Sequence, residues 1–207
     1  MKKTVLTFQL SIKKKAIGII VIVLIGIAEL VMVGQKSNQP TNTSTDSQIA
    51  DEYKGGVKIL FHSSRGEITI QLRNDMPITT SNFKNLVQKG TYNGTIFHRV
   101  IDGFMIQGGD PTGTGYGDPS IPDIKDEFTR KNRNDRGTIA MANAGPNTGS
   151  SQFFINLVNN NFLDPKHPAF GKVTSGMDVV DNIAKVKTNS NDKPKENVSI
   201  INASIVP

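Results

Sequence analysis

The segment FHRVIDGFMIQGGD, residues 97–110, is the most informative stretch of this 207-residue sequence. It places Arg99 among apolar neighbours in a run that suits a β-strand. Because alternate side chains of a strand share a face, Phe97, Arg99 and Ile101 are expected to point the same way. An arginine in this setting usually extends its charged end into solvent. The pattern alone therefore indicates a strand with a surface arginine, and no particular chemistry.

Two further segments are equally specific. Residues 141–155 read MANAGPNTGSSQFFI, and residues 162–173 read FLDPKHPAFGKV. With residues 97–110, in this order and spacing, they resemble the signature blocks of the cyclophilin family of peptidyl-prolyl cis–trans isomerases. The resemblance covers about residues 57–206 and points to a bacterial, membrane-anchored or exported member. It implies a mainly β fold, a closed eight-stranded antiparallel barrel capped by two α-helices.

The local patterns point in the same direction. Residues 57–61 and 67–72 flank an SSRG turn and are typical of a hairpin. Pro77 begins a helix-like stretch that Gly90 ends. Short apolar runs follow at 95–100, 104–107, 137–142, 153–157 and 169–173, then a second helix at 177–185 and a closing strand at 198–206. Many short strands with two helices favour an antiparallel barrel or sandwich over a layered α/β fold.

The resemblance also assigns site residues. The expected catalytic residues are Arg99, Phe104, Gln107 and Asn143. Residues expected to bind substrate, in a proline pocket or along the groove beside it, are Met105, Gly113, Ala142, Ala144, Gln152, Phe154, Phe162, Leu163 and His167. Arg99 would act on the prolyl nitrogen, Gln107 would hold that arginine and the substrate carbonyl, and His167 would lie at the pocket rim.

This chemistry requires no cofactor and no metal, because rotation about a peptide bond breaks no covalent bond. The chain has no cysteine, which excludes disulfides and thiolate chemistry. His62, His98 and His167 match no common metal-ligand spacing. The glycine-rich run 113–117 lacks a following Lys-Ser/Thr and is interpreted as a surface loop instead of a phosphate loop.

One departure from the family concerns the pocket rim. Phe162 stands where many members, including those most sensitive to cyclosporin, carry tryptophan. Phenylalanine still supplies an apolar wall, so isomerase activity is expected to survive. The indole N–H donor is absent, so the resemblance predicts weak cyclosporin binding.

The N-terminal region differs from the rest in composition. Residues 1–15 are basic, and a nearly unbroken apolar run follows at 16–34. Nineteen helical residues span about 28 Å, close to the hydrocarbon thickness of a bilayer. The run is interpreted as a signal anchor, or as a signal peptide cleaved after Gly26-Ile27-Ala28. Either interpretation places the protein at the cell membrane or outside the cell, with the folded domain extracytoplasmic.

A polar segment, residues 35–52, is expected to be a flexible linker to an isomerase domain at 53–207. The net charge of +6 does not mark a nucleic-acid-binding face, because residues 51–207 carry 18 basic and 16 acidic side chains. The expected partners are therefore proline-containing polypeptides and, through the N-terminus, the membrane. The chain is expected to be a monomer. A peptide-binding chaperone with little catalytic role is the alternative.

Overall fold

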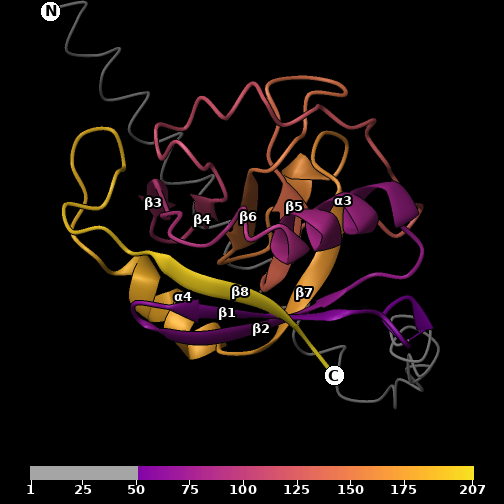
Figure 1. Cartoon of the computed structure of the whole chain (residues 1–207), viewed down its shortest axis with the longest axis horizontal. Helices are drawn as coiled ribbons and strands as arrows, with labels where there is room; N and C mark the ends of the chain where they lie inside the picture. Colours follow the sequence, from indigo (N-terminus) through magenta and orange to yellow (C-terminus); the bar gives the residue numbers. More distant parts are fainter. Residues whose placement is uncertain (1–50) are drawn as a thin grey trace, which may run out of the picture. The chain divides into compact units, whose positions relative to one another are not determined.

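The computed structural model describes residues 51–207, and its secondary structure is mainly β (Figure 1). The strands are β1 (Lys58–Ser63), β2 (Gly66–Leu72), β3 (Arg99–Ile101), β4 (Met105–Gly108), β5 (Thr138–Met141), β6 (Phe153–Asn156), β7 (Ala169–Ser175) and β8 (Ile200–Val206). The helices of this part of the chain are α3 (Pro77–Gln88), α4 (Met177–Ala184) and a short 3₁₀ helix, η1 (Asn161–Leu163).

All eight strands form one antiparallel sheet in the order β3-β4-β6-β5-β7-β2-β1-β8. The sheet curls so that its two edge strands approach each other. At this seam there is no continuous ladder: the amide of Phe97 donates to the carbonyl of Val198 at 2.9 Å, and Ile96 and Ser199 form an isolated bridge. The predicted eight-stranded antiparallel barrel with two helices is confirmed, with a closure that is looser than a full ladder.

The first hairpin shows why the sequence folds this way. Ile59 and Phe61 on β1 are buried, as are Ile68, Ile70 and Leu72 on β2, so that every second residue faces the core. The two strands pair from Lys58 with Gln71 to Ser63 with Gly66. This alternation matches the hairpin expected from the sequence.

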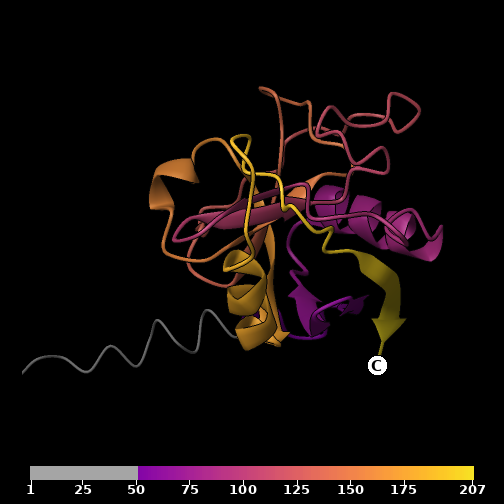
Figure 2. The same ribbon diagram turned by 90° about the vertical axis from the view of Figure 1, so that its left-hand side faces the viewer.

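Helix α3 begins with Pro77 at its first turn and contacts β8. Its buried residues include Phe83, Leu86 and Val87. Helix α4 contacts β2, β3 and β4 instead, so the two helices cover different parts of the sheet (Figures 1 and 2). Both helices lie within one or two residues of their expected positions.

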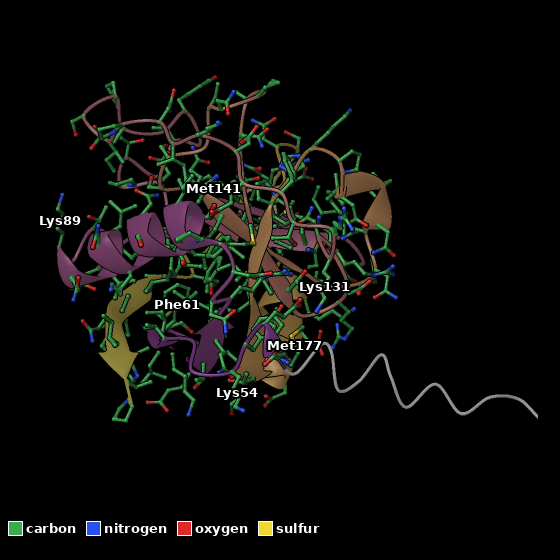
Figure 3. The ribbon with its side chains drawn as sticks, turned by 90° about the vertical axis from the view of Figure 1, so that its right-hand side faces the viewer. Lys54, Phe61, Lys89, Lys131, Met141 and Met177 are labelled. Atoms are coloured by element: carbon green, nitrogen blue, oxygen red, sulfur yellow. The ribbon has the colours of Figure 1, made fainter. Side chains whose placement is uncertain are left out.

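The barrel interior is filled by aromatic rings. Phe83 lies with its ring centroid 5.0 Å from those of Tyr92 and Phe170, and 5.7 Å from that of Phe153. Figure 3 shows Phe61 inside the fold, whereas Lys54 and Lys89 lie at the surface. Burying each large apolar side chain contributes about 1.5–3 kcal/mol, so this interior supplies a rigid base for the outer face.

The folded domain includes Glu52, whose carboxylate is buried 3.2 Å from the guanidinium of Arg73. Among residues 51–207, no helix is long and apolar enough to span a bilayer. The predicted basic segment, the predicted membrane segment at 16–34 and nearly all of the predicted linker lie outside the described residues.

Candidate active site

Strands β3 and β4 bring Arg99 and Gln107 together. The two residues are directly paired in the antiparallel ladder, as are Val100 with Ile106 and Ile101 with Met105. Because directly paired residues share a face, Arg99 and Gln107 lie on the side opposite the buried pair Val100 and Ile106. The side chain of Arg99 is 44% exposed. The guanidinium is therefore presented on the outer face of the barrel.

An apolar cluster lies on this same face. Gln107 pairs with Phe154, Phe154 with Ala140, and Ala140 with Ala169, which continues one row across four strands. Met105, Ala140, Phe154 and Ala169 are buried and form a cluster separate from the main core, against which Ile101, Phe104, Ala142 and Leu163 pack half-buried. The four residues predicted to form the proline pocket, Phe104, Met105, Phe154 and Leu163, all belong to this cluster.

Two rings form the rim of the cluster. The ring of Phe162 stacks on that of Phe104, with centroids 6.1 Å apart, and its side chain is 68% exposed. The ring of His167 meets Phe154 edge-on at 5.4 Å, and its Nδ1 lies 3.0 Å from the carbonyl oxygen of Met141. The resemblance assigned both residues to the pocket rim, and the structure places each ring against a member of this cluster.

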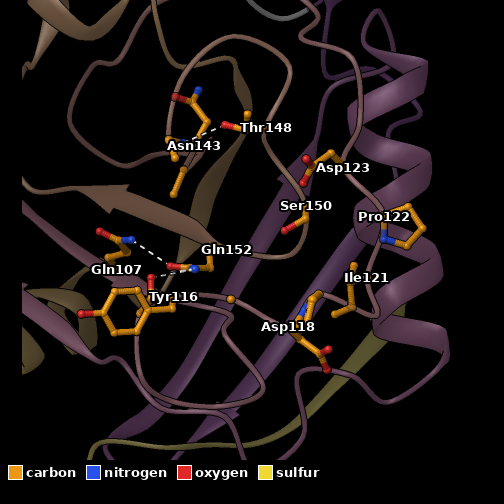
Figure 4. A pocket seen from close by; sticks show the side chains of 15 residues that line it. Gln107, Tyr116, Asp118, Ile121, Pro122, Asp123, Asn143, Thr148, Ser150 and Gln152 are labelled. Carbon is orange, nitrogen blue, oxygen red and sulfur yellow. Dashed lines mark hydrogen bonds between the residues drawn. The ribbon is translucent and has the colours of Figure 1, made fainter.

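Gln107 is held by another glutamine. Its Nε2 donates to Oε1 of Gln152 at 3.0 Å, and Nε2 of Gln152 donates to the carbonyl of Gly115 at 3.1 Å (Figure 4). The resemblance assigned Gln107 to holding the arginine, whereas its hydrogen bond in this structure runs to Gln152. The amide pair ties the sheet face to the loop that carries Gly115.

The partner of Arg99 is Asp192. Nε of Arg99 lies 3.5 Å from Oδ2 of Asp192. Asp192 has a positive φ of 59°, and its carbonyl accepts a hydrogen bond from the amide of Val100 at 2.8 Å. Sequence reasoning missed this residue, because it lies in a polar loop remote from the signature blocks.

The glycine-rich loop folds around its own carboxylate. The buried carboxylate of Asp110 accepts hydrogen bonds from the Thr112 amide and hydroxyl at 2.9 Å, the Gly115 amide at 2.7 Å and the Gly117 amide at 3.3 Å. Burial acts to raise the pKa of Asp110, but these hydrogen bonds outweigh it and the net pKa is lowered. The amides that a phosphate would need are thus already used, in agreement with the surface-loop interpretation.

A cavity of about 560 Å³ opens beside this loop. Gln107, Gln152, Ala142, Asn143 and Ala144 line one part of it, as expected for a groove (Figure 4). The remainder comes from residues that the sequence analysis did not assign to the site: Gly115, Tyr116, Gly117, Asp118, Pro119, Ile121, Pro122, Asp123, Thr148 and Ser150.

Two of the predicted site residues make contacts that the sequence did not predict. Gly113 lies outside it and faces Ile96, while its carbonyl accepts from Nζ of Lys193 at 3.3 Å. The side chain of Asn143 does line it, but its Nδ2 donates to the carbonyl of Lys166 at 2.8 Å. Asn143 therefore ties two loops of the site together.

The three histidines have different surroundings. His98 is buried with neither ring nitrogen hydrogen-bonded, and this burial lowers its pKa. His62 lies beside Glu67 on the first hairpin, and His167 lies at the pocket rim. Within residues 51–207, no three His, Cys, Asp or Glu side chains are grouped as a metal ion would require.

Fold and site together define a class of protein: an antiparallel barrel that presents an apolar cluster beside an exposed guanidinium, with a cavity alongside that Gln107 and Ala142 help to line. Such a surface suits an extended peptide with one apolar anchor.

Residues 57–205 match the model of the family described as "Cyclophilin type peptidyl-prolyl cis-trans isomerase/CLD". The chain belongs to this family, and its enzyme class is that of the peptidyl-prolyl cis–trans isomerases.

Similar proteins are eukaryotic. A peptidyl-prolyl cis–trans isomerase-like 1 protein of Aspergillus fumigatus is 47% identical over 152 residues, which cover 72% of this chain and 94% of that protein. A peptidyl-prolyl cis–trans isomerase of Arabidopsis thaliana is 48% identical over 71% of this chain, which spans only 24% of that relative.

Solved structures agree. A cyclophilin-type isomerase of Cryptosporidium parvum superposes with a TM-score of 0.70 at 32% identity and covers 73% of this chain and 98% of its own. A structure of the same protein in the presence of the dipeptide Ala-Pro gives a TM-score of 0.69 at 33% identity, covering 72% of this chain and 99% of its own.

Proposed function

We propose that Arg99 catalyses cis–trans rotation of Xaa-Pro bonds in polypeptides that fold outside the cytoplasm. The observation that carries the catalytic part is the shared face: the half-exposed guanidinium lies on the same row of the sheet as the apolar cluster around Phe154. A proline ring in that cluster would bring its nitrogen towards the guanidinium.

The chemistry follows from the electronic structure of the peptide bond. Resonance gives the C–N bond partial double-bond character and a rotational barrier of about 18–20 kcal/mol. In the twisted transition state the nitrogen becomes pyramidal and its lone pair is free to accept a hydrogen bond. Arg99 would donate to that lone pair far better than to the planar nitrogen of the ground state, so binding favours the transition state. A guanidinium suits this task because it stays charged and projects its donors rigidly.

The surroundings of the cluster support this mechanism. Met105, Phe104, Phe154 and Leu163 would hold the ring, while the groove past Gln107 and Asn143 would hold one flank of the peptide. Apolar walls exclude water and strengthen the hydrogen bond of the arginine at the moment of twisting. No nucleophile or proton transfer is needed, because no covalent bond breaks.

The test is isomerisation of a short Xaa-Pro peptide by the full-length chain and by Arg99→Ala. Removing one preorganised donor should lower kcat/KM by about 10²–10³-fold. Arg99→Lys keeps the charge but loses the rigid fork of donors. Its kcat/KM should lie between that of the wild type and that of Arg99→Ala. Circular dichroism confirms that the variants fold. Equal turnover by wild type and a folded Arg99→Ala variant would rule out the role of Arg99.

The site of action is proposed from the N-terminal sequence. Lysines precede the apolar run 16–34, and the positive-inside rule would then direct the domain outwards. Protease added to intact cells should degrade the domain if it is exposed on the outer face, while a cytoplasmic marker survives. Protection equal to that of the marker would overturn this location.

A peptide-binding chaperone is the second candidate, and the size of the groove favours it. The cavity beside the pocket has a volume of about 560 Å³, and Tyr116 at its lining is 96% exposed. Suppression of aggregation of an unfolded client would survive Arg99→Ala, whereas isomerisation would not. The expected monomeric state and the absence of nucleic-acid partners stay predictions.

A further inference from the structure

A second hollow adjoins the site and has a different character. It measures about 450 Å³, and apolar or aromatic groups of Phe128, Pro146, Pro165 and His167 contribute to its lining. We call it the Phe128 subsite. It shares Asn143 with the larger cavity, and the ring of His167 also contacts Phe154 of the proline pocket. The two hollows and the apolar cluster around Phe154 therefore adjoin one another.

The walls of the Phe128 subsite are fixed by hydrogen bonds between loops. The amide of Asp126 donates to Oδ1 of Asn147 at 2.9 Å, and the amide of Asn147 donates back to Oδ2 of Asp126 at 2.8 Å. Asn143 binds the carbonyl of Lys166, and Asn132 binds that of His167 at 3.1 Å. Three separate stretches of chain are thus tied together, and the hollow is preformed.

Phe128 is one of the aromatic residues that the fold leaves exposed. The interior rings such as Phe153 and Phe170 are fully buried, whereas Phe128 is 45% exposed. An exposed aromatic ring in a concave, largely apolar setting offers contact area that the fold itself leaves unused. Asp126 and Lys166, of opposite charge, also line the subsite, whereas the larger cavity is lined by two acidic residues, Asp118 and Asp123, and by no basic one.

We propose that the Phe128 subsite binds an apolar, preferably aromatic, side chain of the same polypeptide whose proline occupies the pocket. The proposal rests on the proposed function and names its substrate class: segments with an aromatic residue within a few positions of proline. An extended chain advances about 3.3 Å per residue, so a neighbouring side chain reaches an adjoining hollow while the proline stays in place. His167 and Asn143 form the boundary that the peptide would cross.

Calorimetric titration of the full-length chain tests this preference. The probes are alanine-based peptides with one proline, in which phenylalanine replaces alanine at each of the three positions before and after it. At one of these positions, phenylalanine should tighten binding about three- to tenfold relative to alanine, because a partly buried aromatic ring gains part of its full transfer free energy. With the Phe128→Ala variant, this ratio of the two affinities should fall towards one. The Phe128→Leu variant should restore part of the ratio. The matched control is Ile201→Ala, which removes an apolar side chain of similar exposure on β8 and should leave the ratio unchanged.

The outcomes separate this inference from the catalytic proposal. Equal affinity for all peptides, or a gain that persists in folded Phe128→Ala, overturns the subsite. Thermal unfolding of each variant establishes that it is folded. Phe128→Leu keeps an apolar side chain and therefore tests the subsite even if Phe128→Ala does not fold. Isomerisation of the same peptides is measured in parallel. A gain that depends on Phe128 without any turnover would support the subsite and overturn the catalytic proposal.

Discussion

Nε of Arg99 lies 3.5 Å from a carboxylate oxygen of Asp192, and the two side chains are equally exposed. The contact uses the inner nitrogen of the guanidinium. Asp192 is fixed in turn, because its carbonyl accepts the hydrogen bond from Val100, the residue next to Arg99. We therefore expect Asp192 to position the arginine.

Asp192→Asn should lower kcat about two- to fivefold with little change in KM. An exposed ion pair contributes about 0.2–1 kcal/mol, which corresponds to a loss of this size when the arginine is less well aligned. The difference from wild type should shrink at high salt, because exposed charges are screened. Steady-state kinetics at low and high salt provide the measurement. Asp192→Gly controls for the backbone, since glycine accepts the positive φ of 59° without strain. Identical kcat in wild type and Asp192→Asn at low salt would contradict the positioning role.

Gln152→Leu should weaken substrate binding more than catalysis. The change removes both the contact with Gln107 and the contact with the carbonyl of Gly115. Each hydrogen bond contributes about 0.5–1.5 kcal/mol, so a rise of about tenfold in KM is expected, with a smaller fall in kcat. Progress curves over a range of peptide concentrations separate the two constants. A pure loss of kcat would show instead that Gln152 acts on the transition state.

Much of the fold could be predicted because its signals are local. The hairpin of β1 and β2 follows from strict alternation, and α3 follows from Pro77 at its start and the apolar face of Phe83, Leu86 and Val87. The seam between β3 and β8 could not be predicted from these patterns. It depends on how far the whole sheet curls, which no segment determines by itself.

The sequence likewise predicts some of the site residues and misses others. The pairing of Arg99 with Gln107 follows from a short hairpin, and the resemblance supplied the pocket residues. Asp192 and Phe128 were missed because each reaches the site from a loop without a motif. Long-range packing of loops brings such residues in, and a polar loop sequence carries no signal for it.

Asp110→Asn should destabilise the protein and make its free energy of unfolding depend less on pH in the acid range. The folded-state pKa of Asp110 lies below its usual value of 3.8. A carboxyl group with a depressed pKa contributes stability that is present above the unfolded value and is lost as pH falls through the folded one. Wild type should therefore lose this contribution below about pH 4, and the variant should lack it throughout.

Thermal unfolding of the full-length chain between pH 2 and 7 measures this effect. Leaving buried amides without their acceptor costs about 1–3 kcal/mol near neutral pH. Asp118→Asn is the matched control, because Asp118 lies in the same loop and accepts a bond from the Ser120 amide at 2.8 Å, but it is only half-buried. Equal losses in the two variants would show that the burial of Asp110 has no special role.

Phe162→Trp should strengthen cyclosporin binding about two- to tenfold. The ring of Phe162 stacks on Phe104 and is largely exposed, so an indole can replace it without disturbing the core. The new N–H offers one hydrogen bond to the ligand, and such a bond contributes about 0.5–1.5 kcal/mol.

Since the chain contains no tryptophan, the introduced indole also provides a fluorescence signal for the titration. Calorimetry gives the affinity of wild type, which has no such signal. Phe162→Ala separates the contribution of ring packing from that of the donor. If the tryptophan variant binds no more tightly than wild type, the missing N–H is not what limits affinity.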